Sequence, residues 1–400
     1  MVHHTIKAAS LLAFGVMTMA SVAAHAETEI KINGFVKLDS IYSRFSDGAP
    51  ISAARDFYAP GLTPVVPGGG ETKEYLDMHA KESRLAVQTS TKVGDYTLGS
   101  FAAVDFIVNP GSTADERFAN AYTPGLRQFY LTFGPITAGQ DYTTFQNMVA
   151  LPESLDFSGW PADGTPFIRQ ALVRYTQGGF DISLENPNTL VTNATNNRLI
   201  ADESVLPDVA ARYRFGSGGN VFSIAGLLRQ LRYDGGTPIV NVQALPARSS
   251  DTLGYGASFA GKVTFDPNND IRFTVSGGRG IGRYLAYNAV NDVQIGSDGK
   301  LDGIDVYNGF LAYRHVWSQH WHSTLMGAYL RANHDTDVIG ESVSRDIYSA
   351  AINLIYIPVE PVWIGVEYRH ASRELESGDA GQLDRVQFSL KYLFSWGTRI

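Results

Sequence analysis

The chain has 400 residues, with 32 Lys and Arg against 40 Asp and Glu, which gives a formal net charge of -8 at pH 7. A chain with this acidic balance is excluded as a generic nucleic-acid binder. Cysteine is absent, which excludes a disulfide framework and a thiolate metal site. We therefore expect stability to come from burial or from a membrane.

Residues 1–26 predict a secretory signal peptide. Lys7 gives a weakly basic start, an apolar run extends from Ala8 to Val22, and Ala24-His25-Ala26 has the small-x-small pattern of a cleavage site. The run is too short, and too often interrupted by Ser, Thr and Gly, for a membrane anchor helix. We expect an exported chain whose mature part begins near residue 27.

Beyond this segment, the dominant pattern is alternation of apolar and polar residues. In DRVQFSLKYLF, Val386, Phe388 and Leu390 alternate with Arg385 and Gln387, which is the period of a strand with one apolar and one polar face. The same pattern predicts sixteen strands, at 29–43, 82–92, 95–108, 126–133, 135–142, 168–176, 179–185, 208–216, 220–233, 251–265, 270–284, 304–317, 321–332, 344–358, 361–374 and 383–394.

The connections between these strands alternate in length. Tight turns such as VGD, QGG and DPNN separate long loops at 44–81, 109–125, 143–167, 186–207, 234–250 and 285–303. An even number of antiparallel strands, with short turns at one rim and long loops at the other, predicts an all-β transmembrane barrel, because closure leaves no backbone edge unsatisfied in lipid. No linker divides the chain, so we expect residues 27–400 to form one barrel domain in an outer membrane.

Tyr and Phe residues cluster near the predicted strand ends, where amphipathic rings lie at membrane interfaces. They are Tyr42, Tyr175, Phe215, Tyr255, Tyr307, Tyr313, Tyr356, Tyr368, Tyr392 and Phe394. Aromatic residues also favour strands in general. The clustering therefore supports the barrel only together with the alternating turns.

Several segments resemble a known family. The export signal, the terminal strand LKYLF and the long third loop resemble a Gram-negative trimeric porin, and INGFVKLDSIY, ESRLAVQTST and GPITAGQDYTTFQN are similar to the DcaP-like porins. The resemblance implies a homotrimer in contact with outer-membrane lipid and lipopolysaccharide, and it implies dicarboxylates as solutes. One departure is that six residues, SWGTRI, follow Phe394, whereas porins usually end on the aromatic residue.

The polar face of each strand is expected to line the lumen, and it carries more bases than acids. The candidate pore residues are Lys37, Arg84, Arg174, Arg212, Arg214, Arg229 and Arg272, whereas the clear lumen acids are only Asp39, Asp105 and Glu367. A basic wall lowers the energy of an anion in a narrow pore, and guanidinium pairs with carboxylate through two hydrogen bonds. This predicts a passive diffusion channel that prefers small organic anions. Pairing of each arginine with a loop acid would instead make the wall purely structural.

The stretch LPESLDFSGWPADGTPFIRQ, residues 151–170, shows no period and overlaps the third long loop. We expect this loop, about 143–167, to fold inward and narrow the channel, since irregular backbone is tolerated where it lines a water-filled lumen. Glu153, Asp156 and Asp163 would then face the arginines of the wall and complete the constriction.

The remaining motifs predict no cofactor and no metal. His320 and His322 lie beside Trp321 without a third ligand nearby, which favours an aromatic-rich turn over a metal site. The loop GSDGKLDGID lacks the register and the closing glutamate of a calcium-binding loop. No phosphate-binding loop or nucleophile elbow is found.

Two other classes of protein stay open at this stage. A barrel enzyme of the lipase or protease type would need a Ser/His or Asp/His site near the rim, and His79, His315, His334 and His370 lie at candidate positions. A structural or adhesive barrel would not need basic residues in its interior. Sixteen strands make a wide pore, which favours a channel without enzymatic activity.

Overall fold

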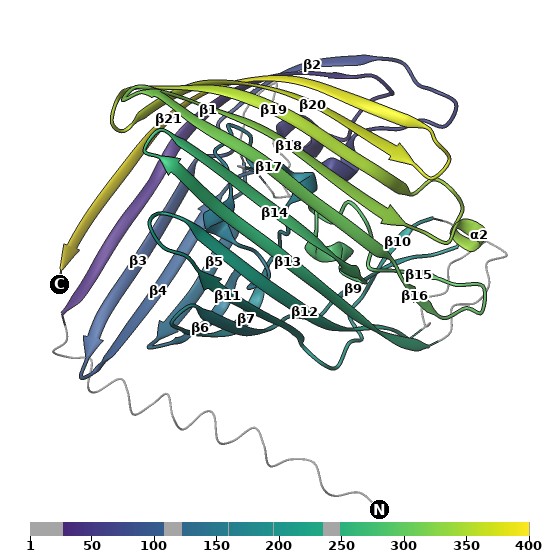
Figure 1. Ribbon diagram of the computed structural model, residues 1–400, viewed down its shortest axis with the longest axis horizontal. Helices are drawn as coiled ribbons and strands as arrows, with labels where there is room; N and C mark the ends of the chain where they lie inside the picture. Colours follow the sequence, from purple (N-terminus) through teal and green to yellow (C-terminus); the bar gives the residue numbers. More distant parts are fainter. Residues whose placement is uncertain (1–26, 108–121, 159, 195, 235–248, 400) are drawn as a thin grey trace, which may run out of the picture.

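The protein is a closed antiparallel β-barrel (Figure 1). The computed structural model describes residues 27–399 apart from 108–121, 159, 195 and 235–248. The predicted signal peptide, residues 1–26, lies outside the described residues. Within the described part of the chain, no helix is long and apolar enough to cross a membrane.

The strands of the barrel follow the chain around the ring. They are β1 (Thr28–Phe45), β2 (Lys73–His79), β3 (Arg84–Val93), β4 (Tyr96–Asp105), β5 (Gly125–Phe133), β6 (Ile136–Tyr142), β7 (Arg169–Gln177), β8 (Phe180–Glu185), β11 (Asp208–Phe215), β12 (Val221–Tyr233), β13 (Ser250–Asp266), β14 (Asn269–Arg279), β17 (Asp305–Ser318), β18 (Trp321–Asn333), β19 (Ser344–Val359), β20 (Val362–Leu375) and β21 (Ala380–Arg399).

These seventeen strands occupy sixteen positions around the barrel, because β2 and β3 share one edge of β1. β2 pairs with Asp39–Phe45 of β1, and β3 pairs with Thr28–Phe35. β1 also pairs with β21 along most of its length, which closes the ring. The predicted sixteen-strand barrel is confirmed. The loop predicted at 44–81 is wrong in one part, because residues 73–79 form β2. The alternation of β2 is weak, since charged Glu74 takes the outward parity of Leu76 and Met78.

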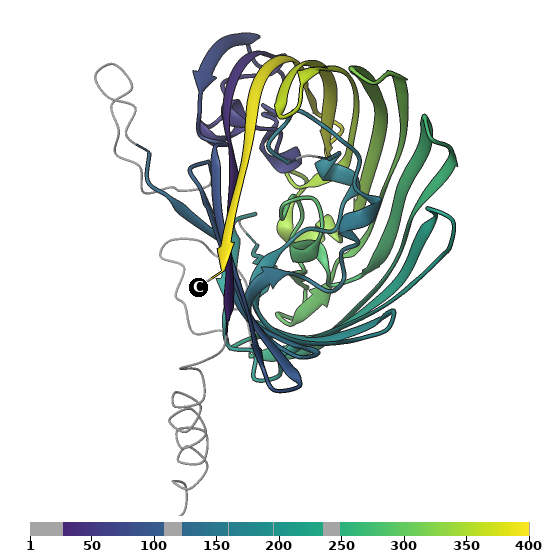
Figure 2. The ribbon, with the colours of Figure 1, turned by 90° about the vertical axis from the view of Figure 1, so that its left-hand side faces the viewer.

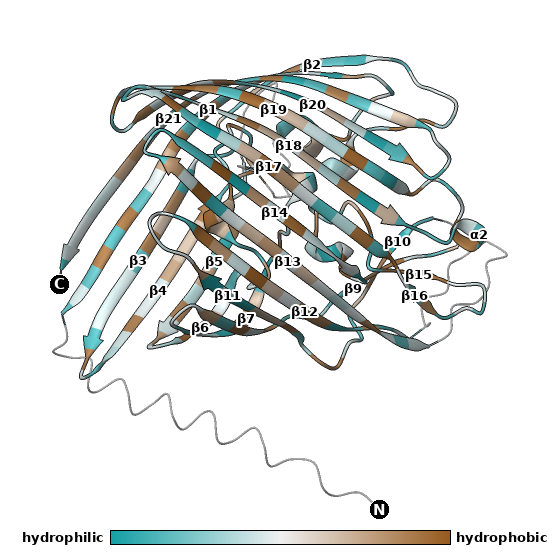
Figure 3. Cartoon of the chain, viewed as in Figure 1, coloured by the Kyte–Doolittle hydropathy of each residue, from teal (hydrophilic) through white to brown (hydrophobic). Residues whose placement is uncertain are grey.

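The alternation of the sequence corresponds to the two faces of the wall. On β21, Val386 and Phe388 are 44% and 48% exposed, whereas the intervening Arg385 and Gln387 are each 2% exposed. Figure 3 shows hydrophobic and hydrophilic residues alternating in this way along the long strands. An outward band of exposed apolar side chains on this scale is suited to lipid rather than to water.

Most of the predicted interface aromatics lie on this outward face. Tyr42, Tyr175, Phe215, Tyr255, Tyr307, Tyr313, Tyr368 and Tyr392 are between 41% and 52% exposed. Rings with a hydroxyl and an apolar body suit the boundary between hydrocarbon and water.

The long loops contain short elements that the sequence pattern did not predict. Strands β9 (Thr189–Thr192), β10 (Arg198–Ala201), β15 (Val293–Ile295) and β16 (Leu301–Gly303) form a second sheet, which joins two of the predicted loops. The helices α1 (Ala53–Asp56) and α2 (Thr336–Ile339) and the 3-10 turns η2 (Pro60–Leu62), η3 (Met148–Ala150), η4 (Ala162–Gly164) and η5 (Gly282–Tyr284) are each about one turn long. Elements of three or four residues are too short to show a period.

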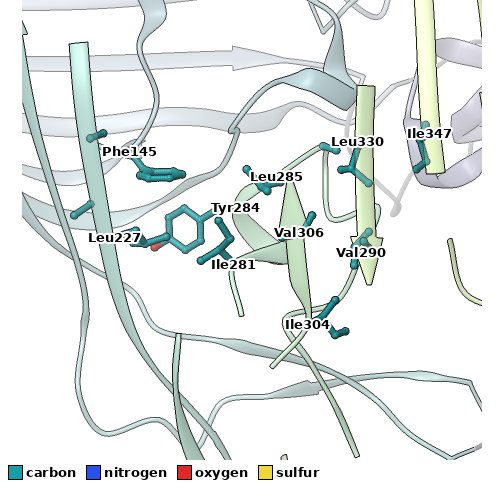
Figure 4. Packing of buried hydrophobic residues seen from close by; sticks show 14 residues of the cluster. Phe145, Leu227, Ile281, Tyr284, Leu285, Val290, Ile304, Val306, Leu330 and Ile347 are labelled. Carbon is teal, nitrogen blue, oxygen red and sulfur yellow. The ribbon is translucent and has the colours of Figure 1, made fainter. Parts of the chain in front are cut away.

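The loop that follows β14 packs against the inner face of the wall through a hydrophobic cluster (Figure 4). The rings of Phe145 and Tyr284 meet edge to face, with 6.3 Å between their centroids. Leu227 of β12 and Leu330 of β18 belong to the same cluster. Burial of these side chains holds the loop inside the barrel mouth rather than above it.

Two strand ends differ from the prediction. The strand predicted to reach residue 284 ends at Arg279, because Gly280 has φ +71°, a left-handed conformation that breaks the extended backbone. At the other end of the chain, β21 continues past Phe394 to Arg399, which pairs with Glu29. The segment SWGTRI therefore extends the last strand.

Candidate functional site

Residues 143–167, apart from residue 159, lie inside the barrel and cross its interior (Figure 2). Near the start of this segment, the backbone N–H of Thr144 donates to Oε1 of Glu185 on β8, at 2.9 Å. Further on, the backbone N–H of Leu155 donates to Oε2 of Glu367 on β20, also at 2.9 Å. β8 and β20 are eight positions apart in a ring of sixteen, so they lie on opposite sides of the barrel. Because residues 143–167 contact both strands, we call them the crossing segment.

Glu153 anchors the middle of the crossing segment to three strands. Its carboxylate lies 2.8 Å from Nε2 of His322, 3.3 Å from Nε of Arg314 and 3.9 Å from Nη2 of Arg272. Burial opposes ionisation, but the hydrogen bond with His322 and the two arginine charges outweigh it and lower the pKa of Glu153 to about 2. Glu153 is therefore ionised at neutral pH and holds the segment to β14, β17 and β18.

Asp156 and Asp163 anchor the later part of the segment in opposite electrostatic surroundings. Burial opposes ionisation of Asp156, but the charges of Arg369 and Arg385 outweigh it and hold its pKa below the usual value. Asp163 accepts a hydrogen bond from Oγ of Ser349 at 2.8 Å, and no cationic group of the described residues lies within 4.0 Å of it. Burial raises the pKa of Asp163 to about 6.

Most of the predicted pore arginines are paired with aspartates on the barrel wall. The pairs are Arg174–Asp141 at 2.9 Å, Arg212–Asp181 at 2.8 Å, Arg214–Asp181 at 3.3 Å, Arg229–Asp208 at 3.0 Å and Arg272–Asp270 at 2.7 Å. The prediction that lumen acids are few is therefore wrong. These aspartates lie at or near strand ends, where alternation does not separate a wall residue from a loop residue.

Arg229 is the most completely enclosed of these arginines. Its side chain is 0% exposed, and Nη1 donates to Asp292 at 2.7 Å and to the backbone oxygen of Gly280 at 2.8 Å. Tyr284 donates to the same Asp208 that pairs with Arg229, at 2.9 Å. A charge with all of these partners holds the wall and the loop together and is not accessible to a solute.

The other two predicted cations, Lys37 and Arg84, differ in how completely carboxylates pair with them. Nζ of Lys37 lies 3.1 Å from Asp39 and also donates to Glu82 and to the backbone oxygen of Leu155, so Lys37 is a further anchor of the crossing segment. Arg84 has one ion-pair contact among the described residues, at 3.6 Å from Asp105. It lines a cavity in the lumen.

The larger cavity, of about 730 Å³, lies on the side of the long loops, and we call it the outer cavity. Arg127, Arg169, Arg198 and Arg373 line it, and Asp105 is the only carboxylate among its described lining residues. Arg127 pairs with Asp105. The other three arginines have no carboxylate within 4.0 Å in the described part of the chain, so their charges are not locally neutralised.

The neutral contacts of these three arginines are nevertheless defined. Nε of Arg198 donates to Oδ1 of Asn291 at 2.5 Å, and Nε of Arg373 donates to Oγ of Ser344 at 2.7 Å. The guanidinium carbon of Arg169 lies 5.6 Å from the ring centroid of Phe167. Such contacts position a cation without cancelling its charge.

The smaller cavity, of about 220 Å³, lies toward the short turns, and we call it the inner cavity. Nζ of Lys391 is 4.1 Å from the ring centroid of Phe35 and 5.2 Å from that of Trp363. Within the described residues, no carboxylate lies within 4.0 Å of Lys391. Arg84 lines the same cavity, with its guanidinium carbon 5.2 Å from the ring centroid of Phe35.

The backbone is strained where it lines the outer cavity. Ala286, Tyr287 and Asn288 have φ values of +50°, +54° and +60°, in the left-handed region that non-glycine residues rarely adopt. The turn projects the ring of Tyr287 onto that of Phe167, with 4.5 Å between centroids. Strain of this kind persists where surrounding packing fixes the conformation, as it does at many binding sites.

Sequence reasoning placed none of the outer-cavity arginines in the site. Arg373 continues the inward parity of Glu367 and Arg369, so alternation could have identified it. Arg127 is displaced by an irregularity in the pairing of β4 with β5, and Arg169 has the outward parity of Ala171 and Val173 at the start of its strand. Arg198 belongs to the loop sheet and carries no periodic signal.

The histidines that sequence analysis considered have local partners. His322 contacts Glu153, and Nδ1 of His320 lies 2.8 Å from the backbone oxygen of Ile357. His334 pairs with Glu376 at 3.0 Å. In the described residues, no group of three or more His, Asp or Glu side chains is placed to hold a metal ion.

The sequence from residue 16 to residue 394 matches the family described as DcaP outer membrane protein. The chain belongs to the DcaP outer membrane protein family. The resemblance predicted from the short motifs is thus confirmed. The DcaP family is a family of outer-membrane porins and channels, and this chain is therefore an outer-membrane protein of that family.

Solved structures of other outer-membrane proteins share this fold. The outer membrane channel DcaP of Acinetobacter baumannii has a TM-score of 0.76 and 23% identity, and the alignment covers 92% of this chain and 97% of that one. OmpT of Vibrio cholerae, in a trimer form, has a TM-score of 0.52 and 11% identity over 92% and 99% of the chains. An anion-selective porin from Comamonas acidovorans has a TM-score of 0.52 and 12% identity over 92% and 100%. No curated protein sequence matches the chain significantly.

Proposed function

We propose that this DcaP-family protein is a passive diffusion channel for small hydrophilic solutes that favours organic anions such as dicarboxylates. The observation that supports this preference is the composition of the outer cavity, where four arginines face a single carboxylate among the described residues. In a narrow space with low-dielectric walls, a surplus of cations raises the local concentration of anions and lowers that of cations. Guanidinium groups also match the planar geometry of carboxylates.

Fewer arginines contribute net positive charge to the pore than the sequence predicts. Arg174, Arg212, Arg214, Arg229 and Arg272 contribute little net charge because each has an aspartate partner. The proposed selectivity is assigned instead to Arg169, Arg198 and Arg373, with Arg84 and Lys391 further along the path. Glu153, Asp156 and Asp163 serve to hold the crossing segment that narrows the path.

Reversal potentials of the purified channel in planar bilayers test this proposal. Under a gradient of sodium succinate at low salt, we expect the wild-type channel to prefer the anion, with the preference falling as added salt screens the wall. An Arg169→Gln/Arg198→Gln/Arg373→Gln variant should lose most of the preference. Arg331→Gln is the matched control, because Arg331 is exposed on β18 and pairs with Asp346 at 3.3 Å. A wild-type channel that prefers sodium would overturn the proposal.

The proposal includes assembly as a homotrimer. Strands β6 and β8 have 7 and 6 residues, whereas a tilted strand needs about 9–11 residues to cross the hydrocarbon core. A neighbouring subunit that covers this side of the barrel would shield it from lipid, and OmpT of Vibrio cholerae, which has the same fold, is described in a trimer form. Mass measurement in mild detergent tests this, and a monomer that stays active would contradict it.

The proposal also includes export and contact with the outer-membrane lipids. Cleavage after residue 26 is expected from the pattern Ala24-His25-Ala26. The outward apolar band and its rim of tyrosines suit contact with lipid and lipopolysaccharide. N-terminal sequencing of protein from the outer-membrane fraction tests the cleavage, and a start at Met1 would contradict it.

A further inference from the structure

The outer and inner cavities share two lining residues, Arg127 and Phe157. The guanidinium carbon of Arg127 is 5.2 Å from the ring centroid of Phe157, which the crossing segment carries. Arg127 also pairs with Asp105 and donates to Oη of Tyr142 at 3.1 Å. Because these contacts fix Arg127 and Phe157 against each other, the two residues form a partition between the cavities.

On the long-loop side of the partition, the uncompensated charges are guanidinium groups. Arg169, Arg198 and Arg373 present planar donors that fit both oxygens of a carboxylate. Several guanidinium groups around one cavity can engage two carboxylates of the same solute. This side of the path therefore distinguishes anions by their shape as well as by their charge.

On the short-turn side, the two carboxylates that line the inner cavity, Glu82 and Asp156, pair with Lys37 and Arg385. The principal charge without such a partner among the described residues is the ammonium group of Lys391. It lies against the faces of Phe35 and Trp363, and these rings hold the cation while leaving its charge available. Arg84 adds a second cation that is only partly balanced by Asp105 at 3.6 Å. An ammonium group attracts anions as a point charge, with little preference for the geometry of the anion.

We infer that a permeating organic anion rests at two stations in series, separated by the partition of Arg127 and Phe157. The outer station consists of Arg169, Arg198 and Arg373, and it selects carboxylates. The inner station consists of Lys391 and Arg84, and its main attraction, from the ammonium group of Lys391, depends on the charge of the anion rather than on its shape. This inference rests on the proposed anion preference. It adds that the path of the anion has two successive binding regions.

Single-channel recordings with succinate added to one side at a time test the two stations. Arg169→Gln/Arg373→Gln should lower the association rate of succinate from the long-loop side roughly fivefold, and from the short-turn side less than twofold. Lys391→Met should show the reverse pattern, since it keeps the length and apolar stem of the side chain. Arg331→Gln, outside the lumen, should change neither rate.

The shape dependence of the outer station gives a second readout. Replacement of succinate by sulfate should reduce the effect of Arg169→Gln/Arg373→Gln but leave that of Lys391→Met unchanged. Phe157→Ala should merge the two cavities, raising conductance and making blockade equally fast from both sides. If each variant changes the two association rates equally while the wild-type channel still prefers anions, the path has one station and the inference is overturned. If the wild-type channel has no anion preference, the proposed function itself fails.

Discussion

Arg229 and Arg373 both extend from barrel strands toward the interior, yet the surroundings of their charges differ. Arg229 is enclosed and contacts Asp208 and Asp292 at 3.0 and 2.7 Å. Arg373 lines the outer cavity, where it donates to Oγ of Ser344 and to the backbone oxygen of Thr63 at 2.7 and 3.0 Å. The first arrangement neutralises the cation within the protein, whereas the second leaves its charge for a solute. An inward arginine is therefore part of the wall or part of the path according to its partners.

The strongest test of this distinction is removal of the enclosed cation. Arg229→Met leaves Asp208 and Asp292 buried near each other without their shared partner, which should lower the free energy of unfolding by about 3–5 kcal/mol. Urea unfolding of the purified barrel in detergent measures this change. Arg229→Met together with Asp208→Asn and Asp292→Asn should recover much of the loss. A single variant as stable as the wild type would show that Arg229 does not hold the wall.

Asp163 provides the reverse case, a buried acid with no cationic group within 4.0 Å among the described residues. Its pKa is about 6 in the folded state against 3.8 in its ordinary state, so the folded protein binds the proton more tightly between these values. The free energy of unfolding should therefore fall as pH rises from about 4 to about 6, by ~3 kcal/mol in total, and change no further above that range.

The difference between wild type and Asp163→Asn isolates this titration, because the amide oxygen can still accept the hydrogen bond from Ser349. The pH-dependent fall should be absent from the variant. Asp156→Asn is a control with the opposite expected effect, because nearby arginines lower the pKa of Asp156. Its substitution should therefore lower the free energy of unfolding at neutral pH. A wild-type and an Asp163→Asn profile that run parallel from pH 4 to pH 6 would exclude a buried, protonated Asp163.

A smaller effect is expected when a whole neutral pair is removed from the wall. Arg174→Gln/Asp141→Asn keeps the net charge of the lumen and should reduce the free energy of unfolding by only ~1 kcal/mol. Its reversal potential in succinate should equal that of the wild type. Arg174→Ala alone should lower the anion preference, because it exposes Asp141. A double variant with altered selectivity would show that the pair itself acts on the solute.

The smallest effect on stability is expected at the cations that face the cavities. Arg169→Gln removes no ion pair among the described residues and should change the free energy of unfolding by less than about 0.5 kcal/mol. It should nevertheless reduce the anion preference measured by reversal potential. A large loss of stability without a change in selectivity would place Arg169 with the wall arginines.

Much of the barrel could be predicted from the sequence because its period is repeated in long strands. β21 shows this clearly, since Val386 and Phe388 face outward and Arg385 and Gln387 face inward over a strand of 20 residues. The strands of the small loop sheet, with three or four residues each, are too short to show a period. In β2 the charged Glu74 takes the outward parity of Leu76 and Met78, which weakens the alternation. The irregular stretch around Glu153 was assigned to a loop for the right reason, since it shows neither period.

The candidate site was less accessible to sequence reasoning. Alternation identifies which side of the wall Arg174 and Arg212 occupy, but it does not show that Asp141 and Asp181 neutralise them. Pairing depends on register between strands, and register follows from the three-dimensional closure of the barrel. For this reason the predicted set contained wall residues and lacked Arg169 and Arg198.

The crossing segment also has a mechanical consequence. A ring of strands can flatten into an oval with little change in energy, because flattening changes no hydrogen bond between neighbouring strands. Residues 143–167 connect β8 to β20, which are half a circumference apart, and Glu153 adds fixed points on β14, β17 and β18. The crossing segment therefore links opposite sides of the barrel. The contacts that narrow the channel also keep the cross-section of the barrel constant.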